Sequence, residues 1–245
     1  MVECRVWDAE VQVRLLPPRL VNFYTNNITM KIFLDTADFD AIIERSRTGI
    51  IAGVTTNPTL VRKQGVNYRD LIAQLCDESF AFESVSAEVN GRTAEELLED
   101  AENYIGLGEA VTIKLPLHKE GLIACKELTD RGIKTNVTLC FSAAQAAVTA
   151  LSGATYVSPF VGRLNDNSVS GVELIRAISG LYCTQGQKTK ILAASLRDVH
   201  HVSRCLLYGA NVVTLPVSVF DKMYNHVLTD AGLNIFEQDF AQLSK

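Results

Sequence analysis

The stretch Ala110-Val111-Thr112-Ile113-Lys114-Leu115 is a short apolar run rich in β-branched residues, with one lysine inside it. Runs of this composition are typical of buried strands, and seven others occur along the chain. Longer segments of helical period separate them, which is the pattern of a parallel sheet with crossover helices. The eight predicted strands are residues 31–35, 51–55, 82–89, 110–115, 133–139, 156–160, 190–194 and 212–215.

The segments between these strands carry apolar residues every three or four positions. In residues 93–104, Leu97 and Leu98 belong to an apolar stripe, whereas Glu95 and Glu99 lie on the polar face. Eight strand–helix units close naturally into an α/β fold, the (β/α)8 TIM barrel. An open doubly wound sheet is disfavoured, because no G-x-G-x-x-G turn for a dinucleotide follows a strand. Similar helices are expected at residues 142–151, 172–178, 198–207 and 217–227.

Both ends of the chain differ from this repeating pattern. Residues 1–29 have no strand or helix period, so we expect a disordered or non-native N-terminal extension. A transit peptide is the weaker alternative because acidic residues occur in this segment. Residues 30–230 should form the barrel. Residues 231–245 should form an extra C-terminal helix, and its apolar residues, such as Phe236 and Phe240, should contact another subunit of a homo-oligomer.

Composition excludes several classes of function. A formal net charge of −5 leaves no basic stripe for nucleic acid or an anionic membrane, and no long apolar run predicts a membrane span. Six scattered cysteines without a C-x-x-C pair or a signal peptide indicate reduced thiols in a cytoplasmic protein. The adjacent His200 and His201 point to different sides of a helix, so we expect no metal site.

Lys114 carries most of the functional prediction, because catalytic groups of a barrel lie at the carboxyl ends of its strands. Burying a lysine in an apolar strand is costly unless a carboxylate pairs with it or it loses its proton. The uncharged amine is the form that attacks a ketone. A structural ion pair with Asp35 or Glu88 is an equal alternative on this spacing. The order of the three residues, on the first, third and fourth strands, favours catalysis.

Three other strand-end residues also have two interpretations. Asp35 and Glu88 suit separate proton transfers, because different surroundings hold two carboxyls in different protonation states. Capping of the next helix is an alternative for Asp35, and the two interpretations stay open. For Asn57, which precedes Pro58, the helix cap is the favoured interpretation on the residues alone.

Arg163 and Arg197 follow the sixth and seventh predicted strands, near the place where barrels often hold a phosphate. The guanidinium fork suits phosphate oxygens, and Ser195 adds a short hydroxyl donor. A surface salt bridge is the commoner fate of any one arginine. Two arginines on adjacent strand ends therefore favour a phosphate site.

Six motifs recur in a family whose members match this chain from residue 30 to the C-terminus. The motifs are Phe33-Leu34-Asp35-Thr36-Ala37, Gly53-Val54-Thr55-Thr56-Asn57-Pro58-Thr59-Leu60, Ile113-Lys114-Leu115-Pro116, Asn136-Val137-Thr138-Leu139-Cys140-Phe141-Ser142, Ser158-Pro159-Phe160-Val161-Gly162-Arg163 and Ala194-Ser195-Leu196-Arg197. In these motifs the chain resembles the transaldolase family. The second motif and the lysine strand are together highly specific.

The resemblance implies an enzyme without metal or cofactor that acts in the pentose phosphate pathway. It would transfer a dihydroxyacetone unit from a ketose phosphate, such as sedoheptulose 7-phosphate or fructose 6-phosphate, to an aldose phosphate. By resemblance Lys114 forms the Schiff base and Asp35 takes the proton of the C4 hydroxyl. Glu88 would act through a water that Thr138 helps to hold. The implied substrate-binding residues are Asn57, Asn136, Ser158, Phe160, Arg163, Ser195 and Arg197.

Two other functions stay open. Short chains of this kind resemble the fructose-6-phosphate aldolases, which release free dihydroxyacetone and carry glutamine and tyrosine where this chain has Glu88 and Phe160. Both positions here favour the transaldolase. A barrel that binds sugar phosphates without turnover is disfavoured by the intact set of Asp35, Glu88 and Lys114. Short members also resemble one another in a last helix that reaches an adjacent subunit, which implies a ring such as a pentamer or decamer.

Overall fold

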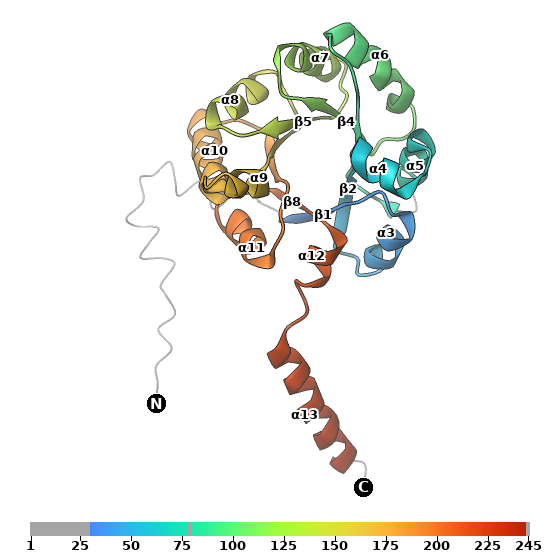
Figure 1. Ribbon diagram of the computed structural model, residues 1–245, viewed down its shortest axis with the longest axis vertical. Helices are drawn as coiled ribbons and strands as arrows, with labels where there is room; N and C mark the ends of the chain where they lie inside the picture. Colours follow the sequence, from blue (N-terminus) through green and yellow to red (C-terminus); the bar gives the residue numbers. More distant parts are fainter. Residues whose placement is uncertain (1–29, 78–79, 244–245) are drawn as a thin grey trace. The chain divides into compact units, whose positions relative to one another are not determined.

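The chain forms a closed barrel of eight parallel strands in sequence order, with helices outside the ring (Figure 1). This is a computed structural model, and it describes residues 30–77 and 80–243, so the predicted extension at residues 1–29 lies outside the described residues. The strands are β1 (Lys31–Asp35), β2 (Ile51–Thr55), β3 (Ser84–Glu88), β4 (Val111–Pro116), β5 (Thr135–Cys140), β6 (Tyr156–Pro159), β7 (Lys190–Ala193) and β8 (Val212–Leu215).

The predicted (β/α)8 barrel is confirmed, and each strand boundary lies within two residues of its predicted position. The strands β6 and β7 each end one residue early. The reason is local, because Phe160 and Ala194 pair only as an isolated parallel bridge beyond the regular ladder. The apolar, β-branched runs therefore predicted the strands well, and the deviations lie where the chain leaves the sheet.

Most of the helices begin at a polar side chain that caps them, whereas α9 (Val161–Asp166) and α12 (Val217–Asp221) begin without one. Thr93, Ser142 and Asp198, which start three of the predicted helices, each accept a hydrogen bond from the backbone N–H three residues later. The helices are α3 (Phe39–Ser46), α4 (Pro58–Gln64), α5 (Tyr68–Leu75), α6 (Ala94–Ile105), α7 (Lys119–Asp130), α8 (Ala143–Leu151), α9 (Val161–Asp166), α10 (Gly171–Gln185), α11 (Val199–Leu207), α12 (Val217–Asp221) and α13 (Val227–Leu243).

The C-terminal region differs from the prediction in where its helices end. A single helix over residues 217–227 was expected, but α12 ends at Asp221 and α13 begins at Val227. The last helix is therefore longer than predicted. None of its residues is buried, and Phe236 and Leu243 are 61% and 80% exposed. The extra C-terminal helix is confirmed, and its apolar side chains are open to contact in the single chain.

Side chains fill the barrel in layers, because every second residue of a strand points inward. Phe33, Tyr156, Leu192 and Val212 belong to one apolar cluster. The rings of Phe33 and Tyr156 meet edge to face with centroids 6.1 Å apart. Gly53 belongs beside them, since a Cβ there would lie 2.9 Å from the Phe33 ring and 2.4 Å from a backbone oxygen. This layer is the apolar floor of the barrel's carboxyl end.

Ion pairs occupy the amino end of the barrel. The carboxylate of Glu83, just before β3, accepts hydrogen bonds from Lys31, from Lys190 at 2.6 Å and from the Tyr156 hydroxyl at 2.9 Å. Lys134 donates to the backbone oxygen of Glu83 at 2.8 Å. Burial lowers the pKa of all three lysines, and the charge of Lys190 adds to the effect at Lys31 and Lys134.

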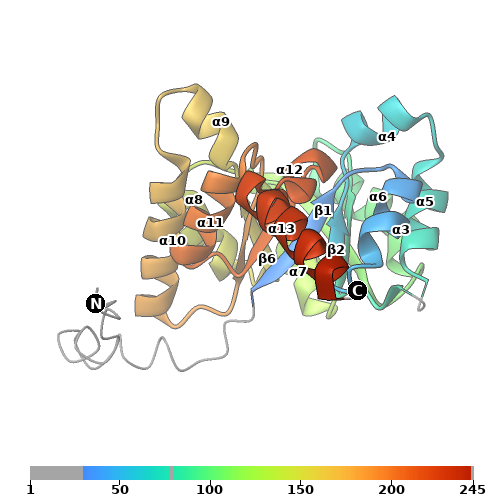
Figure 2. The same ribbon diagram turned by 90° about the horizontal axis from the view of Figure 1, so that it is seen from below.

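The candidate site follows from the same two-residue period. Asp35 lies two residues after Phe33 and Ser158 two residues after Tyr156, so both point into the layer above the apolar floor. The short helices α4, α9 and α12 begin directly after β2, β6 and β8 and lie together at this end of the barrel (Figure 2). The strand ends, the Asn57 cap of α4 and the first turn of α9 form the walls of one cavity.

Candidate active site

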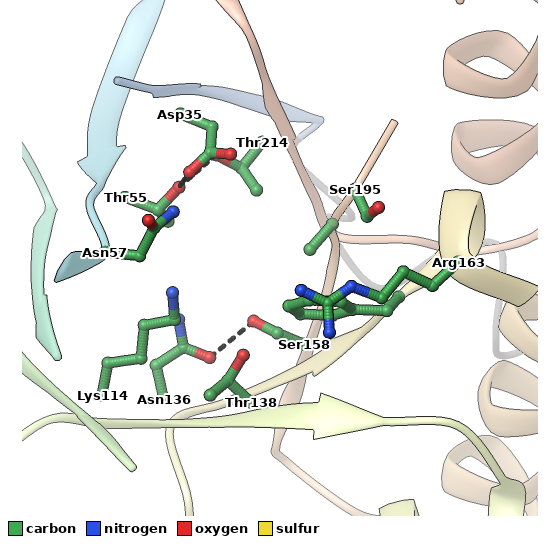
Figure 3. Close-up of a pocket in the computed structure, with 12 residues that line it drawn as sticks. Asp35, Thr55, Asn57, Lys114, Asn136, Thr138, Ser158, Arg163, Ser195 and Thr214 are labelled. Atoms are coloured by element: carbon green, nitrogen blue, oxygen red, sulfur yellow. Dashed lines mark hydrogen bonds between the residues drawn. The ribbon is translucent and has the colours of Figure 1, made fainter. Parts of the chain in front are cut away.

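A cavity of about 150 Å³ opens at the carboxyl end of the barrel (Figure 3). It is smaller than the roughly 300 to 1,000 Å³ pockets that hold drug-sized ligands, which favours a small polar substrate. Nine of the eleven predicted site residues line it, and Glu88 and Arg197 do not. The nine are Asp35, Asn57, Lys114, Asn136, Thr138, Ser158, Phe160, Arg163 and Ser195.

Lys114 lies in the wall of this cavity with only 8% of its side chain exposed. Its Nζ is 2.8 Å from Glu88 Oε2 and donates to the Thr56 backbone oxygen at 3.1 Å. The strand register explains the ion pair, because Glu88 and Lys114 are direct partners on β3 and β4. Of the two carboxylates that the sequence offered, the structure pairs the lysine with Glu88. A proton can therefore pass between this amine and a carboxylate within the site.

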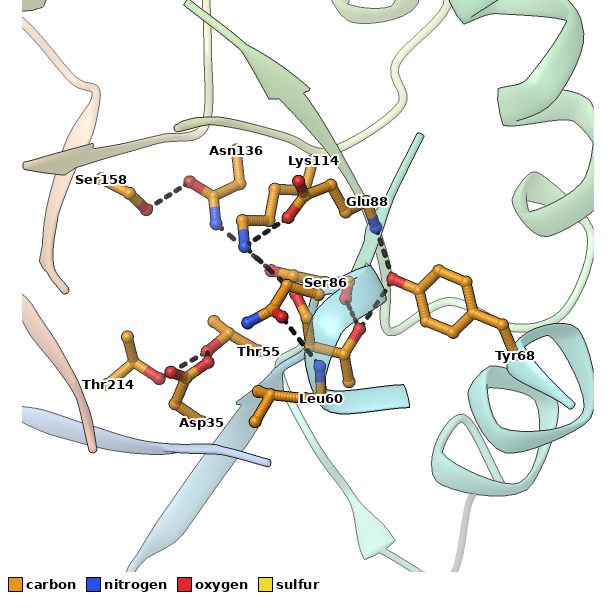
Figure 4. Close-up of polar contacts among 12 residues, drawn as sticks. Asp35, Thr55, Leu60, Tyr68, Ser86, Glu88, Lys114, Asn136, Ser158 and Thr214 are labelled. Carbon is orange, nitrogen blue, oxygen red and sulfur yellow. Dashed lines mark hydrogen bonds and ion pairs between the residues drawn. The ribbon is translucent and has the colours of Figure 1, made fainter. Parts of the chain in front are cut away.

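Tyr68 on α5 contacts the backbone of Glu88 (Figure 4). The Glu88 backbone N–H donates to the Tyr68 hydroxyl oxygen at 2.6 Å. That oxygen is 2.7 Å from Thr56 Oγ1, which donates to the Ser86 backbone oxygen at 2.8 Å. Burial raises the pKa of Tyr68, so its hydroxyl keeps its proton and can donate to Thr56. Tyr68 was not predicted, because it lies on a helix and not at a strand end.

Asp35 lies across the cavity from Lys114 (Figure 3). Thr55 Oγ1 donates to Asp35 Oδ1 at 2.8 Å, and Thr214 Oγ1 lies 2.6 Å from the same hydroxyl. The capping alternative is wrong for Asp35, because Asp38 caps α3. Burial raises the pKa of Asp35, although the charge of Lys114 and the Thr55 hydrogen bond oppose the rise. A carboxylate in these surroundings is a stronger base than a free one.

We expect Asp35→Asn to increase stability near pH 7. The folded-state pKa of Asp35 lies above its unfolded value of about 3.9, so wild-type stability falls as pH rises through the interval between them. An amide at this position does not ionise, so the stability of the variant does not fall over this pH interval. The amide oxygen still accepts a hydrogen bond from Thr55. Urea unfolding at a series of pH values from about 4 to 8 measures the difference. A difference in unfolding free energy between the variant and the wild type that stays constant over this range would contradict the raised pKa of Asp35.

Asn57 both caps a helix and faces the cavity. Its Oδ1 accepts the Leu60 backbone N–H at 3.0 Å, which confirms the predicted cap of α4. The hydrogen bond also fixes the orientation of the amide, since only the oxygen accepts. The Nδ2 group is therefore left as a donor toward the cavity that Asn57 lines.

Asn136 and Thr138 lie on β5 and differ in the hydrogen bonds that their side chains make. Asn136 is fully buried, accepts from Ser158 Oγ at 2.7 Å and donates to Ser86 Oγ at 3.3 Å. The buried Thr138 hydroxyl has no hydrogen-bond partner within residues 30–77 and 80–243. The ladder with β6 shifts register here, and Leu139 has a φ of 64°, a strain typical of active sites. An unsatisfied hydroxyl at a cavity wall is a binding position for water or substrate.

The two predicted arginines differ in their contacts. The Arg163 guanidinium lies 4.9 Å from the centre of the Phe160 ring and lines the cavity. Arg197 instead donates two hydrogen bonds to Asp166, at 2.5 and 2.6 Å. Ser195, two residues before it, lines the cavity with a φ of 58°. The structure therefore places Arg163 at the cavity and Arg197 beside it, paired with a carboxylate.

Three further residues of the cavity wall, Thr55, Ala194 and Thr214, were not predicted as site residues. Thr55 and Thr214 line the cavity beside Asp35. A signal for both was present in the sequence. Thr55 lies within a quoted motif, and Thr214 is two residues after the inward-pointing Val212, so the two-residue period would have found it.

Metal sites and membrane-spanning helices are absent from the part of the chain that the structure describes. Over residues 30–77 and 80–243, no three His, Cys, Asp or Glu side chains are grouped so that they could hold a metal ion. No helix in this part of the chain has the length and apolar character needed to cross a membrane.

The comparison with known proteins adds an independent finding. The family described as Transaldolase/Fructose-6-phosphate aldolase matches residues 32–245. The chain belongs to this family. A probable transaldolase of Caulobacter vibrioides is 46% identical over 212 residues, which cover 86% of this chain and 97% of that protein. A probable transaldolase 2 of Bacillus anthracis is 47% identical over 221 residues, or 88% and 100%. The family name covers two reactions, transfer and aldol cleavage.

Proposed function

We propose that this chain is a transaldolase that binds ketose phosphates covalently through Lys114 and passes the dihydroxyacetone unit to an aldose phosphate, as in the pentose phosphate pathway. The observation that carries the proposal is the placement of one buried lysine between two carboxyls. Lys114 lies 2.8 Å from Glu88, and Asp35 lines the same small cavity. An amine that forms a covalent adduct needs a partner that takes its proton. Cleavage of the carbon–carbon bond needs a base that takes the proton of the C4 hydroxyl.

The first step joins the amine to the C2 carbonyl of the donor sugar. Lys114 passes a proton to Glu88, attacks C2 and forms a carbinolamine. Glu88 then returns a proton to the departing hydroxyl, so that one water leaves and an iminium remains. The unsatisfied Thr138 hydroxyl supports this step, because it offers a hydrogen bond to that water.

The second step breaks the bond between C3 and C4. Asp35 takes the proton of the C4 hydroxyl, the C4 oxygen becomes an aldehyde, and the bonding electrons move onto the iminium to give an enamine. The raised pKa of Asp35 suits this role as a base. The Asn57 Nδ2 group and the hydrogen-bonded pair of Asn136 and Ser158 hold the hydroxyls of the dihydroxyacetone unit.

The fate of the enamine decides between transfer and release. Release requires a proton on C3 and then hydrolysis, whereas transfer requires an aldehyde acceptor. The Phe160 ring lines the cavity and has no hydroxyl to donate. The enamine therefore persists until an acceptor binds, and its C3 then attacks the aldehyde carbon of the acceptor. Asp35 returns its proton to the oxygen of that carbon, which becomes the new C4 hydroxyl.

One assay tests the function. The protein is supplied with fructose 6-phosphate and erythrose 4-phosphate, and sedoheptulose 7-phosphate, glyceraldehyde 3-phosphate and free dihydroxyacetone are measured together. We expect the two phosphorylated products in equal amounts with little dihydroxyacetone. Release of dihydroxyacetone at the rate of cleavage would identify an aldolase. Binding of fructose 6-phosphate without either reaction would identify a binding protein.

Self-association through α13 is part of the proposal. Its apolar side chains are exposed in the single chain, and Ile235 and Phe236 are each more than half exposed. We expect a chain that lacks residues 227–245 to keep the melting temperature of the barrel within a few degrees at low protein concentration, but to form a smaller assembly. Sedimentation velocity measures the mass. An unchanged mass would contradict this role for α13.

A further inference from the structure

The two arginines near the cavity are in different electrostatic states. Arg163 stacks on Phe160, and no carboxylate pairs with it among the residues that the structure describes. Arg197 presents both Nη groups to the two oxygens of Asp166, at 2.5 and 2.6 Å. This bidentate arrangement is the one in which a guanidinium also binds a phosphate. Asp166 thus occupies the groups of Arg197 that a phosphate would use.

The position of Asp166 is unfavourable for the helix that carries it. Asp166 is the last residue of α9, and a negative charge at a helix C-terminus opposes the helix dipole. The pair with Arg197 offsets this cost. Asp166 is about half exposed, so the pair is within reach of a dissolved anion.

The backbone keeps α9 close to the loop that carries Arg197. The Gly162 N–H donates to the Ser195 backbone oxygen at 3.0 Å, and a Cβ at residue 162 would lie 2.1 Å from that oxygen. The Asn165 amide lies 3.3 Å from His201 Nε2 on α11. These contacts leave the side chains of Asp166 and Arg197 as the parts free to exchange partners.

We propose that Asp166 is a specificity-determining residue, because it occupies the Arg197 guanidinium until a phosphate dianion displaces it. The inference rests on the proposed function in one respect, that the natural substrates carry a phosphate. A dianion with three oxygens competes with a carboxylate for a guanidinium, whereas a sugar hydroxyl does not. A phosphorylated substrate therefore gains Arg197 in addition to Arg163, and an unphosphorylated one gains neither.

The test uses inorganic phosphate and Asp166→Asn in the full chain. Exposed ion pairs are worth about 0.2 to 1 kcal/mol, or roughly 1.4-fold to fivefold in affinity. We expect the variant to bind inorganic phosphate about threefold more tightly in calorimetry, and its KM for fructose 6-phosphate to fall by a similar factor. Binding of free dihydroxyacetone, which carries no phosphate, should stay unchanged. Asp130→Asn is the matched control, because Asp130 pairs with Lys126 on the outer helix α7.

The double variant Asp166→Asn with Arg197→Ala isolates the mechanism, since the gain in phosphate affinity should disappear without the guanidinium. Weaker phosphate binding by Asp166→Asn would mean that Asp166 orients Arg197 for binding, and unchanged binding would mean that the pair does not compete. Either result overturns the inference. Calorimetry with phosphate needs no turnover, so a failure of the proposed transaldolase reaction would be recognised separately in the transfer assay.

Discussion

Replacement of Lys114 by methionine should lower transfer by about 10⁴-fold or more, since loss of a covalent nucleophile removes the reaction path itself. Methionine keeps an unbranched side chain in the buried position and removes the amine. Glu88 loses its cation, but 26% of its side chain is exposed, so water can solvate it. We therefore expect a folded protein. Rates of sedoheptulose 7-phosphate formation measure the loss.

The matched control for this substitution is Lys119→Met. Lys119 is the first residue of α7, and its side chain is 87% exposed. The control should keep its activity. Transfer by Lys114→Met within about tenfold of the wild type would contradict the role of the amine. A melting temperature measured for both variants separates a chemical effect from unfolding.

The combination of Phe160→Tyr and Glu88→Gln should shift the product ratio about tenfold or more toward free dihydroxyacetone. A tyrosine hydroxyl at the cavity wall could protonate the enamine carbon directly or through a water, which opens the route to hydrolysis. The glutamine keeps the shape of Glu88 and removes its charge, and the new tyrosine hydroxyl takes over the proton exchange with the Lys114 amine. The ratio of released dihydroxyacetone to sedoheptulose 7-phosphate measures the shift.

Phe141→Tyr is the control for a new hydroxyl near the site. Its ring lies 5.8 Å from that of Phe160, and Phe141 does not line the cavity. The control should leave the product ratio unchanged. If the double variant folds and still forms the covalent adduct, an unchanged ratio would contradict the proposed role of Phe160.

The barrel was predictable because its signals are local. Each strand is a short apolar run, and a shift by one residue would turn its polar side chains, such as Lys114, away from the interior. The two-residue period also determines which strand-end residues share the cavity. Asp35, Lys114, Arg163 and Ser195 were predicted from their positions at strand ends. The resemblance to the transaldolase family implied the other five residues of the wall, Asn57, Asn136, Thr138, Ser158 and Phe160.

Other parts of the site depend on contacts that no strand pattern encodes. Tyr68 reaches Glu88 from a helix twenty residues earlier in the chain, and Asp166 reaches Arg197 from a helix that follows a different strand. Strand order places Arg197 near the cavity, but it does not predict that Asp166 pairs with the guanidinium. The break between α12 and α13 lies at residues 222–226, a polar segment without a helix breaker such as proline.

Borohydride reduction in the presence of fructose 6-phosphate tests the central claim most directly. The reagent converts an iminium to a stable amine, so the donor unit stays attached to the lysine that formed it. Peptide mapping by mass spectrometry should find an added mass derived from the donor sugar on Lys114, and none on the Lys114→Met variant. An adduct on another lysine, or turnover without any adduct, would contradict the account.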